Sequence, residues 1–279
     1  MSRLSETFKI GGLDIAALSD GAPDRELSGF FHGVDPAEWT KAVGISDAKD
    51  PVPSNFGTFL IRGDGHTTLV DTGFCPPAAT MGIPGGGELL QRLDDLGVPL
   101  GDVDRIVQTH LHLDHCGWNV GKDRELTFPN ATIFVCETEF AFWTSEETAD
   151  PERRKAALRA IIPPHEAGRV ETFTGEHAVS DAITMIPTPG HTPEHCSVPL
   201  TSQGEHLVIA GDVAHHPVHF EHHDWIPSVD LDLAESTRSR GKLSALAAGK
   251  DAEVTGGHFP ILTLGKVRRV EGGYRWEGV

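Results

Sequence analysis

Residues 104–119 read DRIVQTHLHLDHCGWN, and this stretch holds the densest group of potential metal ligands in the chain. Its beginning, Asp104–Thr109, is typical of a short buried strand. Three histidines and one aspartate follow within six residues, separated by leucines that can anchor the loop in a core: His110, His112, Asp114 and His115. Imidazoles and a carboxylate packed this closely would lose hydration and repel one another when protonated. The stretch therefore predicts a metal site at the end of a strand.

Further potential ligands follow predicted strands elsewhere in the chain, each close to a glycine or a proline. They are Asp71 in TLVDTG, His191 in TPGHTPEH, Asp212 in VIAGDVAHH and His258 in VTGGHFP. Loops at one end of a sheet converge in space although their residues are far apart in sequence. We therefore expect these side chains to join the cluster at 110–115.

The remaining patterns predict a single layered α/β domain that occupies residues 1–279. Alternating residues around glycine turns predict hairpins at 8–21, 55–73 and 266–279. Further strands are predicted at 104–109, 131–137, 171–174, 182–188, 205–212 and 252–257. Helices are predicted at 88–97, 137–143, 151–162 and from about Asp230 to Ala248, where Gly249 ends the last one. The segment at about 20–53 has no clear period and is expected to form an irregular flap.

The chain is acidic and unusually rich in histidine. Its 279 residues include 41 Asp and Glu against 23 Lys and Arg, a net charge of −18, and 16 histidines. This charge disfavours nucleic acids and anionic membranes as partners, and no apolar run approaches the ~18 residues of a membrane span. The first residues lack the apolar region of a secretory signal, and the four cysteines form no CxxC pair. We therefore expect a soluble protein in the reducing cytoplasm.

The order of the motifs HxHxDH, GHT, GD and GGH, from Asp71 to Pro260, resembles the metallo-β-lactamase superfamily. The resemblance implies a four-layer αββα sandwich with a pair of metal ions at the edges of the sheets. It assigns one metal to His110, His112 and His191, and the other to Asp114, His115 and His258. Asp212 would bridge the two ions. Asp71 would accept a hydrogen bond from a ligand imidazole, and His195 would support the ligands without binding metal.

The same resemblance implies a dinuclear metal-dependent hydrolase. Imidazole and carboxylate ligands without thiolate favour two Zn²⁺ ions per chain, although Mn²⁺, Fe²⁺ and Co²⁺ suit the same ligands. A hydroxide bridging the metals would attack the carbonyl or phosphoryl centre of a small lactone or ester. The predicted catalytic residues are Asp114 and His215. His215 would donate a hydrogen bond to the developing oxyanion or protonate the leaving group.

Two features are similar to the branch that contains methyl parathion hydrolase and some lactonases. GDxxH stands at 211–215, where many acyl-homoserine lactonases carry a tyrosine at the last position, and FPNATIFVCETEFAFW stands at 128–143. In that branch the residue corresponding to Trp143 lines the substrate pocket. Trp118 is expected to shape the pocket floor, and Phe30 and Phe31 are expected to form an apolar lid.

Several other functions stay open from the sequence. An organophosphate triesterase or a thioesterase would use the same site, and a mononuclear iron persulfide dioxygenase would need only two histidines and one aspartate. The bridging Asp212 counts against a class B β-lactamase, and the net charge counts against a nuclease. The expected partner is a small-molecule substrate, and a homodimer remains open.

Overall fold

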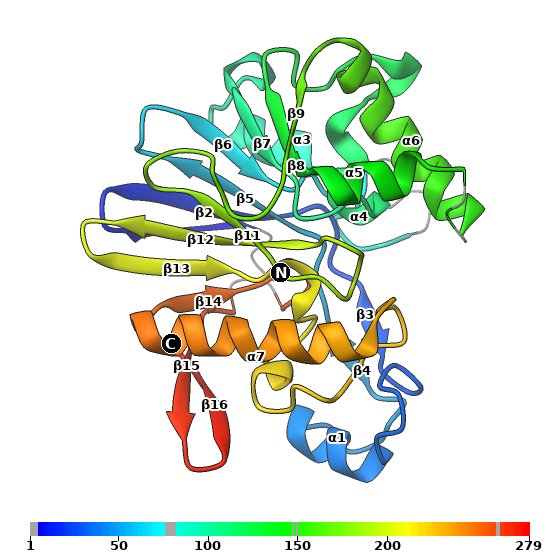
Figure 1. Ribbon diagram of the computed structural model, residues 1–279, viewed down its shortest axis with the longest axis vertical. Coiled ribbons are helices and arrows are strands. Elements are labelled where there is room, and N and C mark those ends of the chain that lie inside the picture. The colour runs from blue at the N-terminus through cyan, green and yellow to red at the C-terminus, as the bar shows by residue number, and fades with distance from the viewer. Residues whose placement is uncertain (1–4, 76–81, 147, 149, 261–262) are drawn as a thin grey trace.

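The computed structural model describes residues 5–75, 82–146, 148, 150–260 and 263–279. Two seven-stranded sheets pack face to face, and helices cover the outer face of each sheet (Figure 1). The predicted αββα sandwich is therefore confirmed. None of the described helices is long and apolar enough to cross a membrane.

The first sheet comes from the N-terminal part of the chain and has the order β1-β2-β5-β6-β7-β8-β9. Its strands are β1 (Ser5–Ile10), β2 (Leu13–Ser19), β5 (Gly57–Arg62), β6 (Thr67–Val70), β7 (Arg105–Val107), β8 (Thr132–Cys136) and β9 (Val170–Phe173). Strands β1 to β6 pair antiparallel, whereas β6 to β9 run parallel. Because β6 and β7 are parallel, Asp71 and His110 leave the sheet at the same edge.

The second sheet has the order β10-β11-β12-β13-β14-β15-β16. Its strands are β10 (His177–Ala178), β11 (Thr184–Pro187), β12 (Cys196–Ser202), β13 (Glu205–Ile209), β14 (Glu253–Thr255), β15 (Gly265–Val270) and β16 (Gly273–Gly278). All neighbours pair antiparallel except β13 and β14, which are parallel. Asp212 and His258 follow these two strands, so they also leave their sheet at a common edge.

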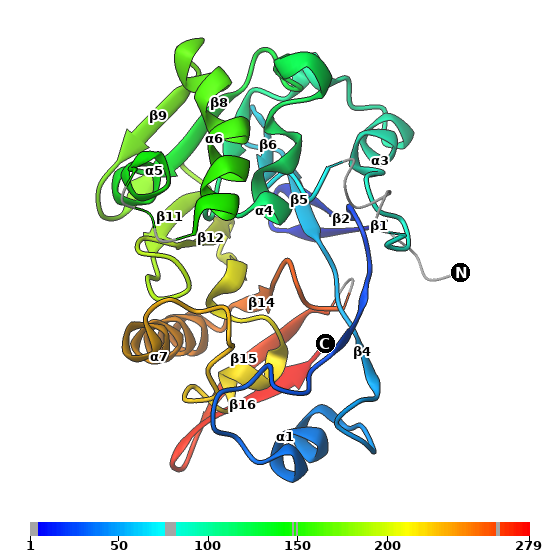
Figure 2. The same ribbon diagram turned by 90° about the vertical axis from the view of Figure 1, so that its right-hand side faces the viewer.

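The helices form the two outer layers. Those on the first sheet are α3 (Leu89–Asp95), α4 (Leu113–Cys116), α5 (Glu137–Thr144) and α6 (Pro151–Glu166), and the one on the second sheet is α7 (Leu233–Lys250). Figures 1 and 2 show the two helical layers separated by the strands of both sheets. Strands β3 (Asp24–Glu26) and β4 (Pro51–Pro53) form a separate two-stranded ribbon beyond one end of α7 (Figure 1). Helix α1 (Pro36–Val43) lies between these two strands in the sequence.

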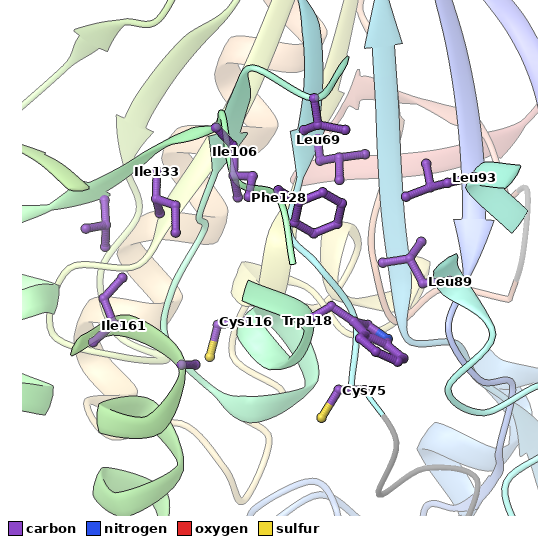
Figure 3. Close-up of a cluster of buried hydrophobic side chains, with 14 of the residues drawn as sticks. Leu69, Cys75, Leu89, Leu93, Ile106, Cys116, Trp118, Phe128, Ile133 and Ile161 are labelled. Carbon is purple, nitrogen blue, oxygen red and sulfur yellow. The ribbon is translucent and has the colours of Figure 1, made fainter. Parts of the chain in front are cut away.

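Three apolar clusters hold the layers together. One lies between the first sheet and its helices, and it contains Leu89, Ile106 and Ile161 (Figure 3). A second lies between the sheets and combines residues from both parts of the chain, such as Ile61 and Val198. The third lies between the second sheet and α7. The central cluster thus joins the N-terminal and C-terminal parts of the chain.

The segment at 20–53 is more regular than predicted. Asp35 accepts a hydrogen bond from the Ala37 N–H at 2.8 Å and caps α1, Pro36 opens the helix, and Gly44 ends it in the left-handed region at φ 83°. These are ordinary helix boundary signals. The prediction failed because α1 is only two turns long and buries a single large apolar side chain, that of Trp39, so no helical period stands out.

Two other predictions of local structure were wrong. Strand β12 was missed because Pro199 interrupts its pattern. In the structure Pro199 pairs with Val208 of β13 but has no partner on the β11 side. Its missing N–H therefore removes no hydrogen bond between β11 and β12. Helix α7 continues through Gly249 to Lys250, and Asp251 ends it with a left-handed φ of 52°. A glycine near a helix end can therefore mislead about the last turn.

Candidate metal centre

The predicted ligands come together at one edge of the sandwich, where strands of both sheets end. His110 and His112 follow β7, Asp114 and His115 lie on α4, His191 lies between β11 and β12, and Asp212 and His258 follow β13 and β14. They fall into groups whose potential ligand atoms all lie within 4.8 Å of one another. The structure thus brings together all the side chains that the sequence marks as ligands.

The first group combines three imidazoles and a carboxylate. His110 Nε2 and His191 Nε2 each lie 3.0 Å from His112 Nδ1. Asp212 Oδ2 lies 3.2 Å from His191 Nε2 and 3.8 Å from His110 Nε2. A tetrahedral zinc ion with Zn–N bonds of about 2.0–2.1 Å would hold its ligand atoms about 3.3 Å apart. The spacing of this group therefore suits a tetrahedral ion.

The second group lies on the other side of Asp212. His115 Nε2 lies 3.3 Å from His258 Nε2 and 3.2 Å from Asp212 Oδ1. Asp114 Oδ2 lies 3.4 Å from His258 Nε2 and 3.9 Å from His115 Nε2. The two oxygens of Asp212 are thus divided: Oδ1 faces His115, whereas Oδ2 faces the first group and also lies 3.2 Å from His258 Nε2. Such a carboxylate could bridge two cations.

Partners outside the cluster fix the tautomer of most ligand imidazoles. His115 Nδ1 lies 2.8 Å from Asp71 Oδ2, His191 Nδ1 lies 2.9 Å from Asp230 Oδ1, and His258 Nδ1 lies 2.8 Å from the Asn55 carbonyl oxygen. An ionised carboxylate or a carbonyl can only accept, so each Nδ1 carries the proton. In the neutral form of each ring, Nε2 then turns a lone pair toward the cluster. Lone pairs that converge in this way fit a bound cation.

Asp71 is the centre of a hydrogen-bond network under the ligand loop. Its Oδ1 accepts from the Thr109 N–H at 2.8 Å and from Gln108 Nε2 at 3.1 Å, and its Oδ2 accepts from Thr109 Oγ1 at 2.8 Å. The Thr109 hydroxyl donates to Asp71, so His110 Nδ1 donates to that hydroxyl at 3.0 Å. Asp71 therefore orients two ligand imidazoles, His115 directly and His110 through Thr109.

His195 supports Asp212 from behind. Its Nε2 accepts the Asp212 N–H at 2.8 Å, and its Nδ1 lies 2.9 Å from Thr188 Oγ1. Gly211, which directly precedes Asp212, has a φ of 61°, and a Cβ at this position would lie 2.4 Å from His195 Nε2. Only glycine allows this contact, which explains the Gly-Asp pair of the motif.

Asp230 and Arg240 are structural supports that the sequence analysis missed. Asp230 joins His191 to Arg240, whose Nη2 donates to Asp230 Oδ2 at 2.7 Å, and both side chains are fully buried. Arg240 also donates to the Val213 carbonyl oxygen at 2.7 Å. An aspartate just before a helix looks like an N-cap, and the true cap is Asp232. The sequence therefore carried no signal for this ion pair.

Charges in the cluster are arranged for a cation. Burial lowers the pKa of His110 and of His112 well below the usual value. Burial also opposes the charge on Asp212, but the neighbouring His115 and His258 outweigh it and hold the pKa of Asp212 well below its usual range. Burial likewise disfavours a charged His115, yet Asp212 and the other nearby carboxylates raise its pKa well above the usual value. An incoming cation would displace that proton.

His215 lies beside the carboxylate of Asp212. Its Nε2 is 3.2 Å from Asp212 Oδ2, and its ring stacks on that of His258 with centroids 5.1 Å apart. Burial lowers the pKa of His215 to about 4, although Asp212 opposes the shift. Its Nδ1 has no partner among the described residues. His215 is therefore a neutral imidazole with an unused polar atom at the site.

The four aromatic residues predicted for the substrate pocket lie in different places. Phe30 packs edge-on against His215 with centroids 5.6 Å apart, whereas Phe31 is buried in a separate apolar cluster with Trp39. Trp143 is buried behind His112, and its Nε1 donates to Glu139 at 2.6 Å. Of the four, only Phe30 has a ring contact with His215 and a half-exposed side chain.

Trp118 does not form a pocket floor. Its indole packs in the cluster beneath the helices of the first sheet, close to Cys75 and Leu89 (Figure 3), and its Nε1 donates to Asp20 Oδ2 at 2.9 Å. The prediction overlooked that the chain turns inward immediately after α4. The buried indole N–H of Trp118 needs a hydrogen-bond acceptor, and that acceptor, Asp20, is 98 residues away in sequence. No local pattern reveals such a partner.

A cavity of about 330 Å³ opens onto the cluster. Its walls include His112, Asp114, His191, Asp212, His215 and His258, together with Arg25, Glu152, Arg153 and Val229. This volume is near the lower end of the range for small-molecule sites. A second cavity of about 910 Å³ adjoins it along α6 and shares Leu113, Glu152 and Ala156. The cluster is thus accessible to a small molecule.

Comparison with known proteins identifies the family of this chain. The family model of the metallo-beta-lactamase superfamily matches residues 58–258. The N-acyl homoserine lactonase AttM of Rhizobium radiobacter is 29% identical over 232 residues, which are 77% of this chain and 84% of that protein.

Two solved structures resemble the whole chain. The hydrolase AbOPH of the beta lactamase superfamily superposes with a TM-score of 0.86 at 26% identity, covering 100% of this chain and 98% of that one. AidC, a dizinc quorum-quenching lactonase solved in complex with a product, superposes with a TM-score of 0.84 at 27% identity, covering 98% and 97%. With a family match over most of its length, the chain belongs to the metallo-beta-lactamase superfamily.

Proposed function

We propose that the cluster holds two divalent metal ions, zinc by its ligand chemistry, and that the protein hydrolyses a small lactone or ester. One observation carries the proposal: ligand imidazoles turn their lone pairs inward on both sides of the single buried carboxylate of Asp212. The first group would be His110, His112 and His191, and the second Asp114, His115 and His258. Asp212 contributes one oxygen to each side.

A bound metal pair would acidify a water molecule and polarise the reacting oxygen of the substrate. Asp114 is ionised and reaches the cavity wall, so it could move the proton. Its pKa is lowered to about 2 because His115 and His258 outweigh the effect of burial, and its side chain is 23% exposed. An ionised carboxylate at the cavity wall can accept a proton from the attacking water and return it to the leaving alcohol.

His215 is suited to stabilise the transition state. At neutral pH it is uncharged, since its pKa is lowered to about 4. A neutral imidazole carries one N–H, which here lies on Nε2 and faces Asp212 Oδ2. With that oxygen bound to a metal ion, the N–H could turn to the substrate oxygen that gains charge. The edge-on contact with Phe30 holds the ring on its outer side. His215 therefore replaces the tyrosine that many acyl-homoserine lactonases use at this position.

A lactone or carboxylic ester is the proposed substrate class because relatives of this chain are named lactonases. Phosphotriesters and thioesters present a similar polarised centre, and they remain alternatives for the same site. A mononuclear iron persulfide dioxygenase is less well supported because the second group, with Asp114, His115 and His258, is complete. The four buried free cysteines support the proposed reducing, cytoplasmic location.

The test is a hydrolysis screen of metal-free protein restored separately with Zn²⁺, Mn²⁺, Co²⁺ or Fe²⁺. The panel contains lactones, aryl esters, thioesters, phosphotriesters and a persulfide. We expect turnover of lactones or esters only after metal is restored, with Zn²⁺ sufficient. Oxidation of the persulfide by the iron-loaded protein, without hydrolysis in any arm, would overturn the proposal.

A further inference from the structure

Arg25 lines the cavity that opens onto the ligand cluster, and the proposed reaction gives this cation no role. It lies at the centre of β3, opposite Val52 of β4. Its neighbours Asp24 and Glu26 are exposed, whereas Arg25 is half-buried. Because side chains alternate along a strand, Arg25 points the other way, into the wall of the cavity that holds the ligand cluster.

The position of Arg25 is fixed from two sides. Its guanidinium carbon lies 5.6 Å from the centroid of the Phe56 ring, a cation–π contact. Its Nη2 lies 3.4 Å from His258 Nδ1. The Phe56 ring in turn packs edge-on against the His258 ring, with centroids 5.9 Å apart. The guanidinium is therefore held against the outer edge of a proposed metal ligand.

The hydrogen-bond donors of Arg25 remain free. His258 Nδ1 donates its proton to the Asn55 carbonyl oxygen at 2.8 Å, so this nitrogen has no lone pair to offer Arg25. Among the described residues Arg25 has no ion pair and no other hydrogen bond. The other arginine of this wall differs, because Arg153 Nε lies 3.3 Å from Asp150 Oδ2. Arg25 is thus a half-buried cation without an anion beside the cavity of the proposed active site.

We infer that Arg25 selects substrates that carry a carboxylate next to the lactone or ester group. This inference rests on the proposed function and names its substrate class. A planar guanidinium matches a carboxylate in a two-point hydrogen bond. Arg25 lines both the main cavity and the small apolar pocket beside Phe30, and His215 and His258 are the other residues common to the two. A carboxylate held there would leave the reacting group over the metal ligands.

Matched substrates give the kinetic test. One pair is γ-butyrolactone-γ-carboxylate and its primary amide, which are similar in size and differ in charge. We expect Arg25→Met to raise KM for the carboxylate about 10- to 100-fold, with kcat little changed, because a charged hydrogen bond remote from the reacting atoms is lost. KM for the amide should change by less than about threefold. Arg25→Lys should have an intermediate effect on KM for the carboxylate, because lysine keeps the charge but cannot form the two-point hydrogen bond.

Arg153→Met is the matched control, since it removes an arginine of the same wall that already has a partner. It should leave the ratio between carboxylate and amide unchanged. Equal losses on both substrates with Arg25→Met would overturn the inference, because Arg25 would then bind a neutral oxygen or only support β3. No preference of the wild-type protein for the carboxylate would overturn it as well.

Binding provides a readout that does not need turnover. Calorimetry with glutarate and with glutaramate, on metal-loaded wild-type and Arg25→Met protein, compares the same charge difference. We expect tighter binding of glutarate by the wild type and a loss of that preference in the variant. If the hydrolysis screen fails but this preference is present, the proposed function is wrong and only the binding of a carboxylate by Arg25 stands. If hydrolysis succeeds and this preference is absent, only the inference fails.

Discussion

The ligand side and the substrate side of the cavity are built in different ways. The ligands follow strands of the two large sheets, and partners such as Asp71 and Asp230 fix their imidazoles. The substrate side comes from the segment at 20–53, where Arg25 lies on a short ribbon and Phe30 packs beside a small separate apolar cluster. The side built on the two large sheets is suited to hold the proposed metals, and the side built on the short ribbon is suited to vary with the substrate.

The largest effects should come from the ligand side. Asp212→Ala and His112→Ala should each lower kcat/KM at least ~10³-fold, because each removes a ligand of the proposed metal pair. Steady-state kinetics at saturating metal provide the measurement. Near-wild-type turnover of either variant would contradict the assignment of metal binding to the ligand side.

His215 lies where the two sides meet, and its substitution should have the next largest effect on activity. We expect His215→Ala to retain both metals and to lose roughly 10²- to 10³-fold in kcat, the usual contribution of a donor to a developing oxyanion. His215→Tyr should recover part of this loss on lactones. Full kcat of the alanine variant with both metals bound would reduce His215 to a loop residue.

Supports behind the ligands should matter less than the ligands themselves. Asp230→Asn should weaken metal binding about 10- to 100-fold, since it removes the charge that orients His191. Competition with a chromogenic chelator measures this affinity. The control is Asp251→Asn, because Asp251 forms ion pairs with Lys266 and Arg268 at the surface away from the cluster. An equal effect of both changes would show that orientation of His191 is unimportant.

Acid should destabilise the metal-free fold through histidines that are held neutral, such as the half-buried His216. Burial lowers the pKa of His216 to about 4, and its Nδ1 accepts the Val218 N–H at 3.1 Å. The unfolded chain takes up this proton near pH 6.5, so stability falls as the pH drops from about 6.5 to 4. His216→Gln should make the slope shallower by up to about 1.4 kcal/mol per pH unit, whereas the exposed His32→Gln should not. Urea unfolding in chelator at several pH values measures the slopes, and identical slopes would contradict this assignment.

The smallest effect on activity is expected for Phe30 on the substrate side. Phe30→Ala should raise KM about fivefold at most, because a partly exposed ring contributes about 1 kcal/mol or less to binding. Phe31→Ala should instead lower the melting temperature, since Phe31 is 5% exposed within the cluster around Trp39. Thermal unfolding and steady-state kinetics of both variants separate the two roles. A larger kinetic effect of Phe31 would show that this cluster shapes the cavity.

Much of the ligand side could be predicted from sequence, and little of its surroundings. Residues His110 to His115 are close in sequence, and glycine or proline marks the strand ends before His191 and His258, so spacing alone carried information. Asp230 and Arg240 meet only because α7 packs on the second sheet. Trp118 was misplaced because its acceptor, Asp20, is 98 residues away. Tertiary contacts between single polar residues leave no local pattern.

Metal stoichiometry tests the central claim most directly. Elemental mass spectrometry of dialysed wild-type protein should find two divalent ions per chain, and His258→Ala should retain about one, in the group of His110, His112 and His191. One ion per wild-type chain, unchanged in His258→Ala, would contradict the account.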